Sequence, residues 1–191
     1  MELIGLEKVH DGKYLKNYEL TYLNKAGREK KYEIVSRKEL RSREDLGRRV
    51  SGVSIVACKE DKMLLLKEFR MGINKEIYNL CAGMLEDGET MEECIRRELY
   101  EETGLSAKKI ECILPPSYSA VAISDIKTNI AFVEVEGELA DHTSENEKIR
   151  PAFYSAKELW HMIQTEEFSS RSQLAAYHFI MMHAKQEKEE T

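Results

Sequence analysis

The apolar and polar pattern of the first fifty residues predicts a small β-structure. Apolar and aromatic residues recur between Tyr14 and Leu23, and a second such run covers Lys31–Ser36. The intervening Asn24–Gly27 is rich in turn-forming residues, so the three segments together predict a β-hairpin. The charged stretch Arg37–Arg49 predicts a linker or a short exposed helix.

Short apolar runs and longer periodic segments follow from residue 51 onward. We expect strands at residues 53–58, 63–69, 77–80, 110–114, 128–136 and 152–154, and helices at 90–103, 156–164 and 172–185. Residues 82–89 and 140–148 read as loops, and Pro115-Pro116 is expected to end the fourth strand. Because strands and helices do not alternate as regular βαβ units, the pattern predicts an α+β sandwich. The expected organisation is a hairpin region with its linker at 1–48 and a larger domain at 49–191.

The composition of the chain limits the kinds of partner that we expect it to bind. It has 191 residues, 42% hydrophobic and 34% charged, with a formal net charge of −6. No overall basic field favours nucleic acid, and no apolar run is long enough for a signal peptide or a membrane span. The four cysteines form no CxxC pair and lie in or beside apolar stretches, which favours reduced, buried thiols over a zinc site. We therefore expect a cytoplasmic protein without nucleic-acid or membrane partners.

The predicted helix at residues 90–103 carries an unusual acidic face. Thr90 and Glu93 form a capping-box pattern at its start. Glu98, Glu101 and Glu102 have i, i+3 and i+4 spacing, which places all three on one face. Like charges at this spacing cost roughly 0.2–0.5 kcal/mol per pair, so the cluster needs either solvent or a cation. Hard oxygen ligands suit Mg²⁺ or Mn²⁺, whereas the alternative is a solvated acidic face.

The residues around this face decide between those interpretations. Glu89 follows Gly83 after five residues, and seven more residues lead to Arg97-Glu98-Leu99. Glu101-Glu102 and Gly104-Leu105 complete the pattern. It resembles the Nudix box at every fixed position, so the chain is identified as a member of the Nudix hydrolase family. The resemblance implies a Nudix-type α/β/α sandwich with a mixed sheet, in which a loop–helix–loop holds a divalent metal against a diphosphate.

The resemblance also implies a role for each residue of the box. Glu98 and Glu102 would bind Mg²⁺ directly, with Mn²⁺ as a substitute, and Glu101 would assist them. The backbone carbonyl of Ala82 would complete the metal shell. Arg97 is expected to brace the glutamates, and the remaining supports of the site would be Gly83, Glu89 and Gly104.

Flanking segments resemble the ADP-ribose pyrophosphatase branch of the family. Leu66–Arg70 followed by Leu80–Gly83 matches its aromatic-Arg pair and the entry to the box, so Arg70 would contact substrate. The acidic segment Ser144–Arg150 looks like the loop that supplies a catalytic base. Glu145 is the first choice for that base and Glu147 the second; the alternative is an exposed acidic loop.

Three departures from the branch leave the substrate open. The entry usually contains Glu and Pro, where this chain has Asn79 and Cys81. A Ser-Pro-Gly element after the box corresponds here to Tyr118–Ala122, with neither proline nor glycine. Tyr118 is nevertheless a candidate to stack on a base, although aromatic residues near strands more often pack.

The hairpin is hard to bury against itself, and by analogy with this branch it would contact a partner subunit in a homodimer. The leading prediction is Mg²⁺-dependent hydrolysis of ADP-ribose or a related NDP-sugar to AMP, or another NMP, and a sugar phosphate. A housecleaning hydrolase of dinucleotides or of NTPs and dNTPs is the alternative. A non-catalytic nucleotide-sugar sensor is a third interpretation, which the complete set of box glutamates disfavours.

Overall fold

The computed structural model describes residues 1–140 and 142–189, with side chains described to residue 184. The chain divides into two compact units. The first contains residues 1–51 and 115–129, and the second contains residues 52–114 and the chain from residue 130 onward. The first division lies close to the boundary expected at residue 48. Residues 115–129, which we expected in the larger domain, belong to the first unit.

The first unit is built on a three-stranded antiparallel sheet. Strands β1 (Glu2–Asp11), β2 (Lys16–Leu23) and β3 (Glu29–Ser36) lie in that order, and a short 3-10 helix covers Arg43–Asp45. The hairpin of β2 and β3 is confirmed. Strand β1 was not predicted, because most of its side chains are exposed and two register shifts interrupt its pairing with β2.

This unit has a small core of its own. Tyr18, Leu20, Ile34 and Leu40 are buried together. The hydroxyl oxygen of Tyr18 accepts a hydrogen bond from the backbone N–H of Leu40 at 2.8 Å, which satisfies its buried polar end. The expectation that the hairpin finds little to bury against itself was therefore wrong, because the segment after β3 folds back over it.

A seven-stranded mixed sheet forms the centre of the fold. Its strands are β4 (Val50–Lys59), β5 (Lys62–Arg70), β6 (Lys75–Asn79), β7 (Cys81–Met84), β8 (Ser106–Tyr118), β9 (Lys127–Glu136) and β10 (Ile149–Ser155). The main path runs β10-β5-β4-β9-β8, while β6 pairs with β5 and β7 pairs with β4.

Two features of this sheet correct the sequence predictions. Strand β8 continues through Pro115 and Pro116, because it is an edge strand and a proline there loses no hydrogen bond inside the sheet. Strand β7 occupies the start of the segment predicted as a loop. Its four residues are too few to show an alternating pattern.

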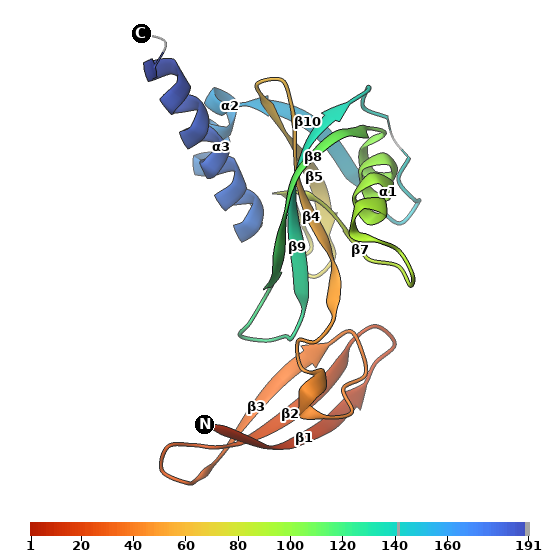
Figure 1. The fold of residues 1–191 in the computed structure, drawn as a ribbon, viewed down its shortest axis with the longest axis vertical. Coiled ribbons are helices and arrows are strands. Elements are labelled where there is room, and N and C mark those ends of the chain that lie inside the picture. The colour runs from red at the N-terminus through yellow and green to blue at the C-terminus, as the bar shows by residue number, and fades with distance from the viewer. Residues whose placement is uncertain (141, 190–191) are drawn as a thin grey trace. The chain divides into compact units, whose positions relative to one another are not determined.

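Helices cover both faces of the sheet in the second unit (Figure 1). Alternate residues of the central strands point to opposite sides. One set, including Ile55 and Leu66, packs with α1 (Met91–Thr103), and the other, including Met63 and Leu65, packs with α2 (Ala156–Thr165) and α3 (Ser170–Glu189). The expected α/β/α sandwich with a mixed sheet is present.

Two further expectations concerned buried cysteines and membrane-spanning segments. All four cysteines are free, and Cys81 and Cys94 are buried, but Cys112 is exposed on β8, contrary to the prediction of four buried thiols. No helix in the described part of the chain is long and apolar enough to cross a membrane.

Candidate active site

The site is built where the short strand β7 meets helix α1. Gly83 on β7 leaves room for the carboxylate of Glu98, since a Cβ added at Gly83 would lie 1.6 Å from the Cδ of Glu98. Glu98 is only 9% exposed. On the other side of β7, a Cβ on Gly52 of β4 would lie 2.0 Å from the carbonyl oxygen of Gly83. Two glycines therefore let a backbone pair approach and a glutamate lie against it.

The second glutamate of the cluster also reaches back to β7. Glu102 Oε2 accepts a hydrogen bond from the backbone N–H of Ala82 at 3.1 Å. Burial raises the pKa of Glu102 to about 8, against the lowering effect of hydrogen bonds from Cys81 and Ala82. Burial likewise raises the pKa of Glu98. Both carboxylates are thus held where an ionised group is costly without a compensating positive charge.

Arg97 is the positive charge at the centre of the cluster. Its Nε and Nη2 donate to the two carboxylate oxygens of Glu89 at 2.8 and 2.9 Å. Its Nη1 donates to Glu98 at 2.8 Å and to Glu101 at 3.1 Å, and Nη2 also reaches the carbonyl of Met84 at 2.9 Å. The hydrogen bonds from Arg97, with a smaller contribution from the N–H of Glu86, lower the pKa of Glu89 to about 2. One guanidinium therefore joins the loop, the helix and the end of β7.

The ends of α1 fix the register of these side chains. At its start the hydroxyl of Thr90 accepts from the N–H of Glu93, and the carboxylate of Glu93 accepts from the N–H of Thr90 at 2.8 Å. At its end Gly104 has a left-handed φ of 75°, and its N–H donates to the carbonyl of Tyr100 at 2.8 Å. The capping box predicted from the sequence is present, and Gly104 supplies the C-terminal cap.

Two neighbouring cavities open onto the acidic face, each of about 340–350 Å³. The first is lined by the three helix glutamates with His142, Ser144 and Glu147. The second contains Ala82 and Arg70, together with Glu68 at its wall. Glu102 and Glu147 line both cavities, so the structure brings the box together with the loop after β9 and with the end of β5.

The two candidate bases differ in position. Glu147 lines both cavities, and its Oε2 accepts from the N–H and the hydroxyl of Ser144 at 3.1 and 2.8 Å. Glu145 is exposed and lines neither cavity. The geometry therefore favours the second choice made from the sequence over the first.

Tyr118 lies in the first unit of the chain. Its ring is beside Gly47 and lines an apolar cavity of about 310 Å³ that also includes Tyr32 and Val121. Lys127 Nζ lies 5.0 Å from the centre of the Tyr118 ring. Tyr118 as a whole is 51% exposed.

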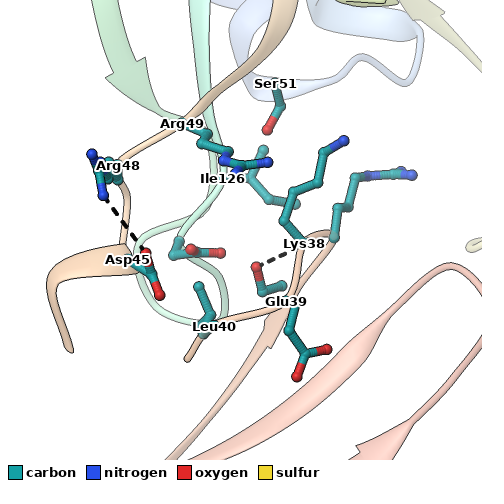
Figure 2. A pocket seen from close by; sticks show the side chains of 11 residues that line it. Lys38, Glu39, Leu40, Asp45, Arg48, Arg49, Ser51 and Ile126 are labelled. Carbon is teal, nitrogen blue, oxygen red and sulfur yellow. Dashed lines mark hydrogen bonds and ion pairs between the residues drawn. The ribbon is translucent and has the colours of Figure 1, made fainter. Parts of the chain in front are cut away.

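A further cavity in the first unit is too small for a nucleotide. Its volume is about 40 Å³, room for a few water molecules, and charged side chains line most of it (Figure 2). The guanidinium of Arg48 is paired with Asp45 at 4.0 Å, and Lys38 and Arg49 extend from neighbouring segments. Acidic and basic groups are interspersed around it, so it does not compete with the glutamate site as the candidate active site.

Comparison with known proteins agrees with this architecture. The family model described as NUDIX domain matches residues 48–177. The chain belongs to the NUDIX family. The segment matched by the family model contains the whole box, both cavities on the acidic face and Tyr118.

Several NUDIX relatives carry names that describe an activity. The ADP-sugar pyrophosphatase of Mus musculus is 28% identical over 69% of this chain and 60% of its own length. The ADP-ribose pyrophosphatase of Escherichia coli K12 is 25% identical over 68% of this chain and 66% of its own length. This chain thus matches just under two thirds of the length of these relatives. A solved structure titled "Crystal structure of ADP compounds hydrolase" superposes with a TM-score of 0.73 at 18% identity, covering 97% of this chain and 94% of that one, which shows the shared fold.

The oxygen-rich donor set fits a divalent cation. Within the part of the chain that the structure describes, no three His, Cys, Asp or Glu side chains are already gathered closely enough to hold a metal. Mg²⁺ is usually bound through one or two carboxylates, with water and substrate phosphates as its other ligands. The two desolvated carboxylates of Glu98 and Glu102 are the donors whose burial a cation would offset.

Sequence reasoning missed two polar residues that line the cavities of this NUDIX site. Glu68 follows Leu64 and Leu66 at alternate positions of β5, so the strand period itself placed it on the face covered by α1. His142 lies in the loop after β9, and its Nδ1 is 3.2 Å from the carbonyl of Tyr100. No periodic pattern in that loop could have indicated its contact with α1.

The Arg97–Glu89 pair predicts a pH-dependent contribution to stability. The pKa of Glu89 is lower in the folded chain than its usual value near 4.5, so its contribution is present above that value and is lost as pH falls toward 2. A Glu89→Gln variant should be less stable than the wild type near pH 6, and the difference should shrink to less than about half by pH 3. Urea unfolding at each pH measures this difference.

Glu92→Gln is the matched control, because Glu92 is exposed near the start of α1 and lies outside the Arg97 network. It should track the wild type at every pH. A Glu89→Gln difference that stays constant from pH 6 to pH 3 would contradict the ion-pair explanation.

Proposed function

We propose that this chain hydrolyses the diphosphate linkage of ADP-ribose or a related NDP-sugar, giving AMP or another NMP and a sugar phosphate. The observation that carries the proposal is the pair of desolvated glutamates, Glu98 and Glu102, held against β7 beside cavities that also contain Arg70 and Glu147. The names of the mouse and E. coli relatives support the choice of substrate class.

The box residues are proposed to hold Mg²⁺, with Mn²⁺ as a substitute. Glu98 and Glu102 would bind it with the carbonyl of Ala82, and Glu101 would assist from the exposed side of the helix. A cation there supplies charge neutralisation of the diphosphate and activation of water. Arg97 would hold Glu98 and Glu101 in position rather than contact the substrate. Its guanidinium is already hydrogen-bonded to these two carboxylates, to Glu89 and to the carbonyl of Met84 at the end of β7.

Proton transfer is assigned to the loop after β9. Water attacks one phosphorus, its proton passes to a carboxylate, and the P–O bond of the diphosphate breaks to leave two phosphate esters. Glu147 is the better placed base, and its contacts to Ser144 orient it. Glu145 is the alternative from the same loop.

Two residues are proposed to contact the rest of the substrate. Arg70 borders the cavity that contains Glu102 and Ala82, so its guanidinium is placed to bind phosphate oxygens. Tyr118, which is half exposed, would stack on a base.

A second candidate activity is cleavage of a dinucleotide. NAD-capped RNA hydrolase NudC of Photobacterium profundum is 48% identical to this chain, but over only 32% of the chain and 23% of its own length. Such a short match supports shared phosphate chemistry more than shared specificity. NTPs and dNTPs, and a sensor role without turnover, are the remaining alternatives.

The purified chain with Mg²⁺ should release AMP from ADP-ribose faster than it cleaves NAD⁺, dNTPs or other NDP-sugars, and EDTA should abolish the release. Glu102→Gln should lower kcat by at least about 100-fold, because a proposed metal ligand is removed. Chromatographic product analysis measures both.

Glu92→Gln is the control and should retain wild-type activity. Cleavage of triphosphates alone would contradict the substrate assignment. Tight binding of ADP-ribose without turnover would favour the sensor, and full activity of Glu102→Gln would overturn the metal assignment.

Two single substitutions, compared by kcat, distinguish the two candidate bases. Glu147→Gln should lower kcat by about 100-fold or more with a small change in KM, because general bases contribute factors of this order. Glu145→Gln, a change of the same chemistry two residues away, should lower kcat less than about threefold. The reverse ranking would reassign the base to Glu145.

We also propose that the chain forms a homodimer through the first unit. Large apolar side chains there are exposed, with Val121 at 71%, Ile123 at 61% and Tyr14 at 68%. Light scattering at micromolar concentration should give twice the mass of one chain, and replacing Val121 and Ile123 by Ser should shift it to the monomer. A monomeric wild type at these concentrations would refute the dimer.

A further inference from the structure

We propose that Glu68 is the positioning residue for Arg70, and that helix α3 anchors it through Asn79 and Ser169. This inference rests on the proposed function, because it assigns Arg70 to the phosphates of the substrate. It describes how Arg70 is held by residues of β5, β6 and the start of α3, all of which lie outside the box.

Glu68 is a buried carboxylate, with 6% of the residue exposed. A carboxylate in such a place needs partners for its oxygens. Its Oε1 accepts from Asn79 Nδ2 at 2.6 Å, and Arg70 Nη1 lies 3.5 Å from both of its oxygens. The side chain of Arg70 is 57% exposed whereas that of Glu68 is 8% exposed, so Glu68 is the buried end of the pair.

The orientation of the Asn79 amide follows from its other contacts. Its Oδ1 accepts from the backbone N–H of Leu80 at 3.0 Å and from the hydroxyl of Ser169 at 2.7 Å. A backbone N–H can only donate, so the carbonyl oxygen of the amide faces Leu80 and the NH₂ group faces Glu68. Glu68 must therefore accept, and its second oxygen stays directed to Arg70.

The chain of contacts ends on α3. The N–H of Ser169 donates to the carbonyl of Tyr78 at 3.0 Å, and the hydroxyl of Ser172 donates to the same carbonyl at 2.8 Å. These bonds tie the start of the helix to β6 at Tyr78, the residue immediately before Asn79. Position 79, where the related branch has glutamate, thus carries an amide whose partner carboxylate comes from β5.

A second cation lies near this pair. Arg171 is half-buried near the start of α3, and burial followed by the like charge of Arg70 lowers its pKa. Glu68 supplies a carboxylate that offsets this like charge at Arg70. Loss of Glu68 should consequently weaken substrate binding more than it slows the chemical step.

A double-mutant cycle on Glu68 and Arg70 tests the inference. Glu68→Gln should raise KM for ADP-ribose about 5- to 10-fold, as expected for one charge-assisted contact, with kcat within about twofold. Arg70→Ala should raise KM at least as much, and the double variant should be no worse than Arg70→Ala alone. The Mg²⁺ concentration for half-maximal activity should be unchanged in Glu68→Gln.

Additive effects of the two substitutions on KM would overturn the inference. A lower kcat or a changed Mg²⁺ requirement in Glu68→Gln would also overturn it, because either result would make Glu68 part of the metal site. If Glu68→Gln fails to fold, Ser169→Ala provides the test. It should raise KM about two- to threefold through the same contacts, whereas Ser170→Ala, at an exposed neighbouring position, should not. An unchanged KM in folded Ser169→Ala would exclude the anchor on α3.

The same cycle separates this inference from the proposed function. If the wild type does not hydrolyse ADP-ribose, calorimetric binding of ADP replaces KM. Coupling between Glu68 and Arg70 in ADP binding would then support the positioning role although the proposed activity had failed. No coupling, or no binding of ADP by the wild type, would overturn the positioning role.

Discussion

The site depends on one electrostatic constraint: two carboxylates are buried against a backbone strand, and the guanidinium of Arg97 contacts one of them, Glu98. Glu98 and Glu102 face β7, where burial raises the pKa of each. Arg97 offsets part of this cost through Glu98, while its bidentate contact with Glu89 ties the preceding loop to the helix. A divalent cation bound by these carboxylates would offset the rest of this cost and would attract an anionic diphosphate.

The residues around this centre come from elements that fold for other reasons. Helix α1 is fixed by its caps and its apolar stripe, and β5 by its place in the middle of the sheet. The loop after β9 is arranged locally by the contacts of Glu147 with Ser144. Rigid elements thus carry the metal side of the site, and a loop carries the proposed base, which suits a group that must adjust to the attacking water.

Much of this arrangement was predictable from the chain. The helix at residues 90–103, its caps and the shared face of its three glutamates follow from helical spacing, and the fixed positions of the box identified the family. What the sequence could not show were contacts between distant segments. Residues 142–147 have no periodicity, so nothing indicated that Glu147 rather than Glu145 lines the cavities. Strand β7 was too short for its pattern to be read, and Glu68 was passed over as a charge at the end of an apolar run.

The contact of Gly52 with Gly83 has an evolutionary consequence. It brings main-chain atoms of β4 and β7 close together, so the approach of these two strands beside the glutamates requires the absence of a side chain at Gly52. Core residues can then drift, exchanging one apolar shape for another, as long as these two positions stay free of a Cβ. A scaffold of this kind tolerates deep divergence, and the solved relative with the same fold shares 18% of its sequence with this chain. Selection can change the residues proposed to contact the substrate while the half of the site proposed to bind metal stays in place.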